Sequence, residues 1–204
     1  VLMYLVQNYD ETKINRMLMS LIVPFGYYQP YVWESASPIP PEVFMGRKVE
    51  LEKIKSPSGV NIVYGGRQLG KSALLKKAKE EIDKDENGDR AVYIDIKDQN
   101  YKQVAERIGA DLFDQGILEE DPDTDDWRVL SRAIRKRLSV EEKGKKIPYL
   151  LILLDEADAF IESCESVKYA PLDILKEIQN IGVGRFKFVI AGLHNIVRFK
   201  HVSS

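Results

Sequence analysis

Cysteine, histidine and long apolar runs are scarce in this chain of 204 residues, which has one cysteine and two histidines. Cys164 cannot form a disulfide within the chain, so we expect a reducing, cytoplasmic setting and a packed thiol without a chemical role. The most apolar early run, residues 17–28, is roughly half as long as a membrane span and contains Pro24. The sequence therefore predicts neither a disulfide scaffold nor a membrane protein.

A marked excess of charge is missing as well, because the net charge at neutral pH is -2. This balance gives no general reason to expect nucleic acid or an acidic membrane surface as a partner. No secretory pattern opens the chain, which begins at Val1, and we expect it to be part of a longer protein. A hydrophobic content of 44% is sufficient for one domain with a sizeable core and an attached piece.

The first 41 residues are patterned differently from the rest. In residues 10–23 an acidic first turn precedes apolar residues at helical spacing, which predicts an amphipathic helix. Residues 27–42 are rich in Pro, Ser and aromatic residues without a consistent period, as is typical of a linker. We therefore predict an N-terminal helical segment with its linker at residues 1–41 and a larger, C-terminally incomplete domain at residues 42–204.

From Val43 onward, short apolar runs alternate with longer helical patterns, which predicts a sheet covered by crossover helices. Two of the runs are almost continuously apolar, as expected of parallel strands that are buried on both faces. The predicted fold class is α/β, a three-layer domain with a parallel sheet, preceded by the short helical segment. The strands are predicted at 61–65, 91–96, 149–155 and 186–192, and the helices at 47–55, 71–84, 101–115, 125–142 and 170–180.

Residues 65–72 match the phosphate-binding motif G-x-x-x-x-G-K-[ST] in full, between a predicted strand and a predicted helix. Glycines let successive amides point inward at a helix N-terminus, where the helix dipole favours negative charge. In this arrangement Lys71 reaches the β and γ phosphates and the Ser72 hydroxyl ligates Mg²⁺. The predicted nucleotide-binding residues are Gly65, Gly66, Arg67, Gln68, Leu69, Gly70, Lys71, Ser72 and Ala73.

Two adjacent acids, Asp155 and Glu156, follow a predicted buried strand. Because the carboxyl ends of parallel strands gather at one edge of a sheet, Asp155 is predicted to hold Mg²⁺. Glu156 is then predicted to orient or deprotonate a water, which favours hydrolysis of the nucleotide over phosphate transfer. The alternative is that these acids only cap and charge the first turn of the next helix.

The last predicted strand is followed by small residues and then by His194 and Asn195. In hydrolases with the Asp-Glu pair, an additional strand lies between the phosphate-loop strand and the acidic strand, so its tip faces the γ-phosphate. We predict that Asn195, or else His194, detects that phosphate. A neutral histidine with a satisfied hydrogen bond is the structural alternative for His194.

Together these motifs resemble the additional-strand P-loop ATPases, specifically the AAA+ and STAND group that includes origin-recognition-type ATPases. The resemblance covers about residues 43–199 and extends to the segment VFMGRKVE at residues 43–50. It implies that Phe44 flanks the adenine and that Arg47 lies near the nucleotide. Lys48 stands where many members have Glu, and the strand tip lacks the arginine of several STAND proteins. Arg185 and Arg198 are not assigned as arginine fingers.

The predicted function is a slow ATPase that binds ATP with Mg²⁺ and couples its phosphate state to flanking domains or a partner protein, in signalling or defence. No guanine-reading Asn/Thr-Lys-x-Asp motif is present, which favours ATP. The alternatives are an origin-recognition-like DNA-binding ATPase, a nucleotide-binding scaffold without turnover, and a small-molecule kinase. The sequence leaves homo-oligomerisation and DNA binding open as further properties. The basic helix near residues 125–142 is explained more simply as a solvated face than as a DNA contact.

Overall fold

The structure of the chain, a computed structural model, describes residues 47–59, 61–66, 70–84, 87–139, 147–182 and 184–192. All of these residues belong to one of the two compact units into which the chain divides, the unit that spans Met45–Ser204. The amphipathic helix expected at residues 10–23 lies outside the described residues. The division of the chain into segments 1–41 and 42–204 stays a prediction.

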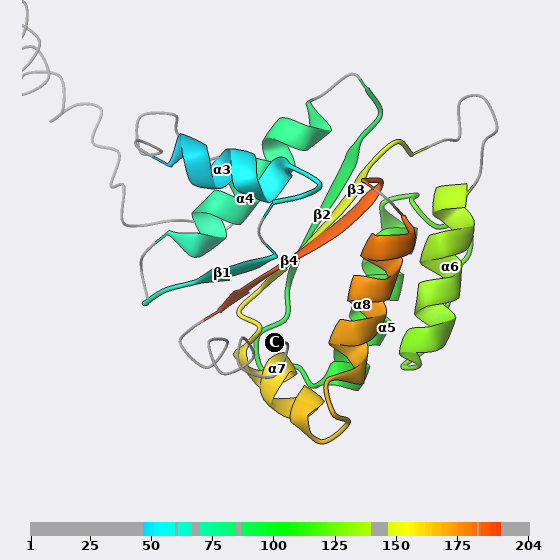
Figure 1. Cartoon of the computed structure of the whole chain (residues 1–204). Helices are drawn as coiled ribbons and strands as arrows, with labels where there is room; N and C mark the ends of the chain where they lie inside the picture. Colours follow the sequence, from blue (N-terminus) through cyan, green and yellow to red (C-terminus); the bar gives the residue numbers. More distant parts are fainter. Residues whose placement is uncertain are drawn as a thin grey trace, which may run out of the picture. The chain divides into compact units, whose positions relative to one another are not determined.

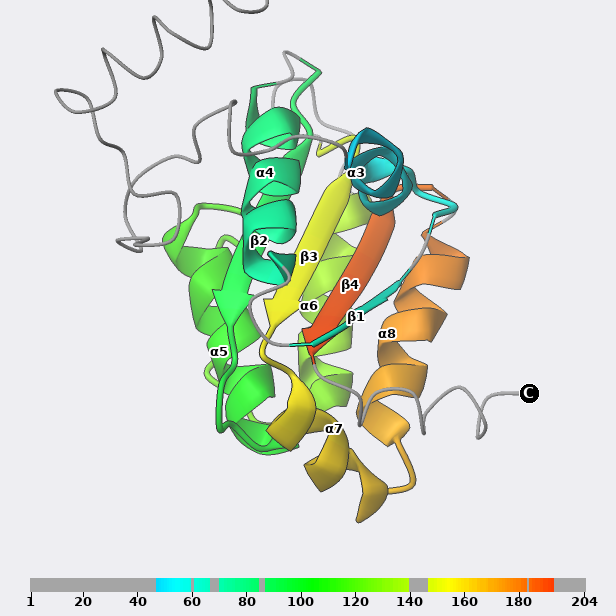
Figure 2. The same ribbon diagram turned by 90° about the vertical axis from the view of Figure 1, so that its left-hand side faces the viewer.

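Four parallel strands form one sheet in the order β1-β4-β3-β2, which Figure 2 shows side by side. At the carboxyl ends, Tyr64 of β1 lies opposite Gly192 of β4, and Asp95 of β2 lies opposite Asp155 of β3. The parallel register therefore gathers the residues that follow all the strands at one edge of the sheet. The strands are β1 (Ile62–Tyr64), β2 (Arg90–Asp95), β3 (Leu150–Asp155) and β4 (Phe186–Gly192).

Helices cover both faces of the sheet and make three layers (Figure 1). One layer holds α3 (Lys48–Lys55) and α4 (Lys71–Asp83), and the layer on the opposite face holds α5, α6 and α8. The predicted α/β fold with a parallel sheet is confirmed. The remaining helices are α5 (Tyr101–Asp114), α6 (Trp127–Ser139), α7 (Asp158–Glu165) and α8 (Ala170–Ile181).

Helix α7 was not among the predicted helices. It is 8 residues long, too short for a helical period to stand out, although one interpretation of the acids after β3 did place them in the first turn of a following helix. Its apolar side chains, Phe160, Ile161 and Cys164, are buried. Cys164 is buried, which confirms the prediction of a packed thiol, and burial raises the pKa of this thiol to about 12.

The core is built around β3, in which every residue is buried. On one side of the sheet, the Trp127 ring of α6 stacks on Phe160 of α7 with 5.8 Å between ring centroids. The Trp127 indole N–H also donates to the Tyr101 carbonyl at 2.8 Å, so a single side chain joins α5, α6 and α7. Within the described residues no helix combines the length and the apolar character needed to cross a membrane.

Lys187, near the start of β4, is completely buried. Its ammonium group donates to the carbonyls of Lys53 and Ile54 at 2.8 Å each and of Ser56 at 2.6 Å. These carbonyls belong to the C-terminal turn of α3 and its C-cap, where backbone acceptors have no partner within the helix. A side chain of the sheet therefore caps the helix that leads toward the phosphate loop.

The buried ammonium makes stability depend on pH in a defined direction. Burial lowers the pKa of Lys187 to about 8 from its ordinary value of 10.5. Above pH 8 the unfolded chain retains a proton that the folded chain has released, so this group raises the free energy of unfolding as pH increases, at most by about 1.4 kcal/mol per pH unit. In Lys187→Met this contribution is absent.

Urea unfolding of both proteins between pH 7 and 9 measures the effect. The difference in unfolding free energy, wild type minus Lys187→Met, should increase with pH, and taking the difference removes the contribution of every other titrating group. A difference that is independent of pH would show that Lys187 keeps an ordinary pKa in the folded protein.

Candidate functional site

The glycine-rich loop leads directly from β1 into α4. Gly70 is the N-cap of α4 and has a left-handed backbone with φ of 69°, a conformation that glycine adopts without strain. Within the described residues no side chain caps the start of α4, and its first turn contains no acidic residue. The amide groups of that turn are therefore available to an anion.

Lys71 places a positive charge inside this loop. Its side chain is 8% exposed, and its ammonium group donates to the carbonyl oxygens of Gly65 at 3.0 Å and Gly66 at 2.9 Å. In the described part of the chain the ammonium forms no salt bridge with a carboxylate. A buried cation without a carboxylate partner and with one N–H left over suits a bound anion.

Arg47, immediately before α3, also reaches the loop. Its Nη1 atom lies 3.7 Å from the point where a side chain on Gly70 would begin. The chain thus brings a second cation to the phosphate loop from a segment that precedes the loop by one helix, α3, and one strand, β1. A position near the nucleotide stays a prediction for Arg47.

Asp155 ends β3 and is 1% exposed. Its Oδ2 atom accepts a hydrogen bond from the Tyr93 hydroxyl at 2.8 Å, and its Oδ1 atom accepts one from the Glu156 backbone N–H at 3.0 Å. No salt bridge to this carboxylate is present among the described residues. A buried carboxylate with two neutral donors and no cationic side chain has the chemistry of a ligand for a cation.

Tyr93, in the middle of β2, was not predicted to be part of the site. Burial and the nearby Asp155 carboxylate raise the pKa of Tyr93, while the Ser72 hydroxyl acts in the opposite direction. Its hydroxyl therefore adjoins Asp155 at the end of β3 and Ser72 in the first turn of α4. The sequence around it, AVYIDI, only indicates a buried strand, and nothing in that pattern identifies the partner of the hydroxyl.

Glu156 follows Asp155 in a left-handed conformation with φ of 53°, which costs a residue with a side chain about 1–3 kcal/mol. The next residue secures this turn, because the Ala157 N–H donates to the Ala191 carbonyl of β4 at 2.9 Å. The Glu156 side chain is partly exposed, and in the described part of the chain it makes no ion pair. The strained turn thus separates a buried carboxylate from an accessible one.

Strand β4 lies between β1, which precedes the phosphate loop, and β3, which ends in Asp155. This is the additional-strand order expected from the sequence, and it places Gly192, the last residue of β4, at the edge where β1 and β3 also end. The residues predicted at that tip, His194 and Asn195, lie outside the described residues, as do Phe44, Arg67, Gln68 and Leu69.

A family model described as an AAA domain matches residues 54–198 of the chain, well over half of its length. The chain belongs to the AAA domain family. No curated protein matches it. The matched range includes the four strands, the phosphate loop and the Asp155-Glu156 pair, whereas Phe44 and Arg47 precede it.

The residues of this AAA domain fit a nucleotide with its metal. P-loop AAA-type ATPase domains bind nucleotide, usually with Mg²⁺, and here the uncapped start of α4 and the Lys71 ammonium offer donors to phosphate. Among the described residues no group of three or more His, Cys, Asp or Glu side chains could hold a metal by itself. A cation at Asp155 would therefore take further ligands from hydroxyl, phosphate and water oxygens, which are the ligands that Mg²⁺ accepts.

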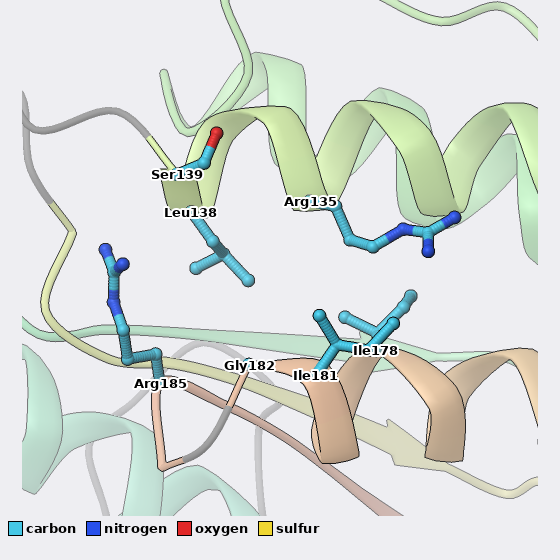
Figure 3. Close-up of a pocket in the computed structure, with 7 residues that line it drawn as sticks. All are labelled: Arg135, Leu138, Ser139, Ile178, Ile181, Gly182 and Arg185. Carbon is cyan, nitrogen blue, oxygen red and sulfur yellow. The ribbon is translucent and has the colours of Figure 1, made fainter.

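A cavity of about 260 Å³ between the ends of α6 and α8 is a separate feature of the AAA domain (Figure 3). It includes Arg185, which immediately precedes β4, so it lies at the amino ends of the strands, whereas the phosphate loop follows the carboxyl end of β1. The cavity cannot be part of the candidate site. Its lining consists of Arg135, Leu138, Ser139, Ile178, Ile181, Gly182 and Arg185.

The left-handed N-cap gives a test that separates the loop from general stability. Gly70→Ala should lower the free energy of unfolding by about 1–2 kcal/mol and weaken binding of a fluorescent ATP analogue, because the strained residue moves the amides at the start of α4. Gly116→Ala is the matched control, since Gly116 has φ of 66° and open space around it but follows α5. Urea unfolding should show similar losses, and equal analogue binding by both variants would contradict a role for Gly70.

Proposed function

We propose that this AAA domain binds ATP with Mg²⁺ at the phosphate loop, hydrolyses it slowly and couples the phosphate state to flanking domains or a partner protein, as a switch of the STAND type. The observation that carries the proposal is the pair of buried, oppositely charged groups at one sheet edge. Lys71 and Asp155 are 8% and 1% exposed, and neither has an ion-pair partner within the described residues. A magnesium-bound nucleotide would supply a counter-charge to each.

Each residue has a distinct role in the proposed reaction. Lys71, which donates to the carbonyls of its own loop, directs its remaining N–H toward the β and γ phosphates. Ser72 and Asp155 hold Mg²⁺, which neutralises the charge of the phosphate oxygens when it is bound. Arg47 adds positive charge beside Gly70. The proposal assigns contact with the adenine to Phe44.

The choice of hydrolysis over phosphate transfer rests on Glu156. Its carboxylate is one residue beyond the metal-holding Asp155, is partly exposed and, among the described residues, has no ionic partner to neutralise it. A carboxylate with these properties can accept a proton from water or orient the water for attack. Detection of the γ-phosphate is assigned to Asn195 or His194, in the segment that follows β4.

The helix α6 explains why DNA binding is the weaker alternative. Two of its basic side chains have structural partners, since Arg135 pairs with Glu177 at 3.1 Å and Arg137 donates to the Ile117 carbonyl at 2.7 Å. The exposed basic residues Arg128, Arg132 and Lys136 are spaced four apart along one face. If turnover were stimulated by DNA with a steep salt dependence, and Gln at these three positions removed the stimulation, the DNA-binding alternative would replace the switch.

Glu156→Gln tests the hydrolytic step. The variant should bind ATP as tightly as the wild type but release phosphate at least roughly a hundredfold more slowly, because the amide cannot accept a proton from water. Phosphate release under single-turnover conditions measures the step, and bound ATP should persist on the variant.

Glu162→Gln is the matched control, since Glu162 is an exposed carboxylate in α7. The Glu162→Gln protein should hydrolyse ATP at the wild-type rate. Equal hydrolysis by Glu156→Gln and the wild type would remove Glu156 from the mechanism. Tight ATP binding without phosphate release by the wild type would instead select the scaffold alternative.

A further inference from the structure

The Tyr93 hydroxyl fixes one half of the Asp155 carboxylate. It donates to Oδ2 at 2.8 Å, while the backbone N–H of Glu156 donates to Oδ1 at 3.0 Å. Each oxygen of the carboxylate thus has one donor, and rotation of the side chain would break both hydrogen bonds. An ionised carboxylate oxygen can accept a further bond, so both oxygens keep acceptor capacity for a metal or its water ligands.

Tyr93 also adjoins the other residue expected at the metal. The Ser72 hydroxyl acts to lower the pKa of Tyr93, so the two residues are neighbours. The Tyr93 side chain is therefore adjacent to the start of α4 as well as to the end of β3.

The aromatic ring is held in place by the helix that contains Ser72. The Lys76 ammonium group lies 5.2 Å from the centroid of the Tyr93 ring, close enough for a cation–π interaction. Lys76 is one helical turn after Ser72, so α4 contacts both the ring and the hydroxyl of the same tyrosine. A phenolic hydroxyl is a hydrogen-bond donor at neutral pH, so the ring held by Lys76 directs a donor at Asp155.

We propose that Tyr93 is a positioning residue for Mg²⁺, whose hydroxyl sets the orientation of Asp155 before the metal and nucleotide bind. The inference rests on the proposed function, because it requires a magnesium-bound nucleotide at this edge of the sheet. In this proposal Tyr93 acts through Asp155 and does not touch the phosphates. Its loss should therefore affect the metal-dependent part of nucleotide binding and spare the part that depends on Lys71.

Tyr93→Phe removes the hydroxyl and keeps the ring under Lys76. We expect the Mg²⁺ concentration for half-maximal binding of a fluorescent ATP analogue to rise by roughly tenfold or more, the usual effect of losing a group that orients a metal ligand. Binding of the same analogue in EDTA should change less than about twofold, which also shows that the variant is folded. Fluorescence titration of the full chain measures both quantities.

Tyr149→Phe is the matched control. Tyr149 is another buried tyrosine whose pKa is raised by burial, but within the described residues its hydroxyl has no hydrogen-bond partner. It immediately precedes β3, at the end opposite Asp155, so its loss should leave the Mg²⁺ dependence unchanged. Mn²⁺ in place of Mg²⁺ adds an independent readout, since the electron spin resonance signal of free Mn²⁺ should be larger with Tyr93→Phe than with either other protein.

The outcomes separate the two proposals. If the wild type binds the analogue more tightly with Mg²⁺ and Tyr93→Phe shows the same Mg²⁺ dependence, Tyr93 does not position the metal ligands, and the proposed function stands. If the hydroxyl were only structural, binding in EDTA and in Mg²⁺ would fall together, which also overturns the inference. If the wild type itself binds no nucleotide, the proposed function fails and the inference fails with it.

Discussion

Main-chain pairing of β3 with strands on both of its sides is the constraint on which the rest of the site depends. Because β2, β3 and β4 are parallel and in register, Asp95 lies opposite Asp155, and Leu154 lies opposite Ile190 two residues before Gly192. The strand ends are therefore fixed relative to one another by the backbone before any polar side chain interacts. The hydrogen bond from Ala157 to Ala191 continues this pairing past the acids and holds the strained turn at Glu156.

The same framework creates two buried charges that the described residues do not neutralise. Lys71 is satisfied by carbonyl oxygens and Asp155 by a hydroxyl and an amide, so both are solvated by neutral dipoles of the protein. Neutral partners lower the cost of burying a charge without cancelling its field. A ligand that carries both a dense negative charge and a divalent cation would meet complementary charge at each position, and this is why the geometry favours a magnesium-bound nucleotide.

Elements with a local signal could be predicted from the sequence, and contacts between distant segments could not. The strand at residues 150–155 is apolar up to its last residue, Asp155, and the loop at 65–72 matches a motif with a known mechanism, so both could be recognised from the sequence alone. The roles of Tyr93 and Lys187 were missed because each side chain has its partner in a distant element. Tyr93 and Asp155 are 62 residues apart in the sequence, and Lys187 and Lys53 of α3 are 134 residues apart. A lysine within an apolar strand was the one available signal for a buried cap, and it does not identify the helix that is capped. Helix α7 was missed for the opposite reason, since its local pattern is too short.

Strand β4 links the candidate site to helix α3. Near its start, Lys187 holds α3, and its last residues pair with β1 just before the phosphate loop. One strand therefore contacts both the helix that follows Arg47 and the strand that leads into the loop.

The central claim is that ATP is hydrolysed at the phosphate loop. Phosphate release from ATP in the presence of Mg²⁺, compared between the wild type and Lys71→Ala, tests this claim most directly. The wild type should release phosphate and the variant should release none above background at the same ATP concentration. Equal release by both proteins would contradict the assignment of this loop as the site of ATP hydrolysis.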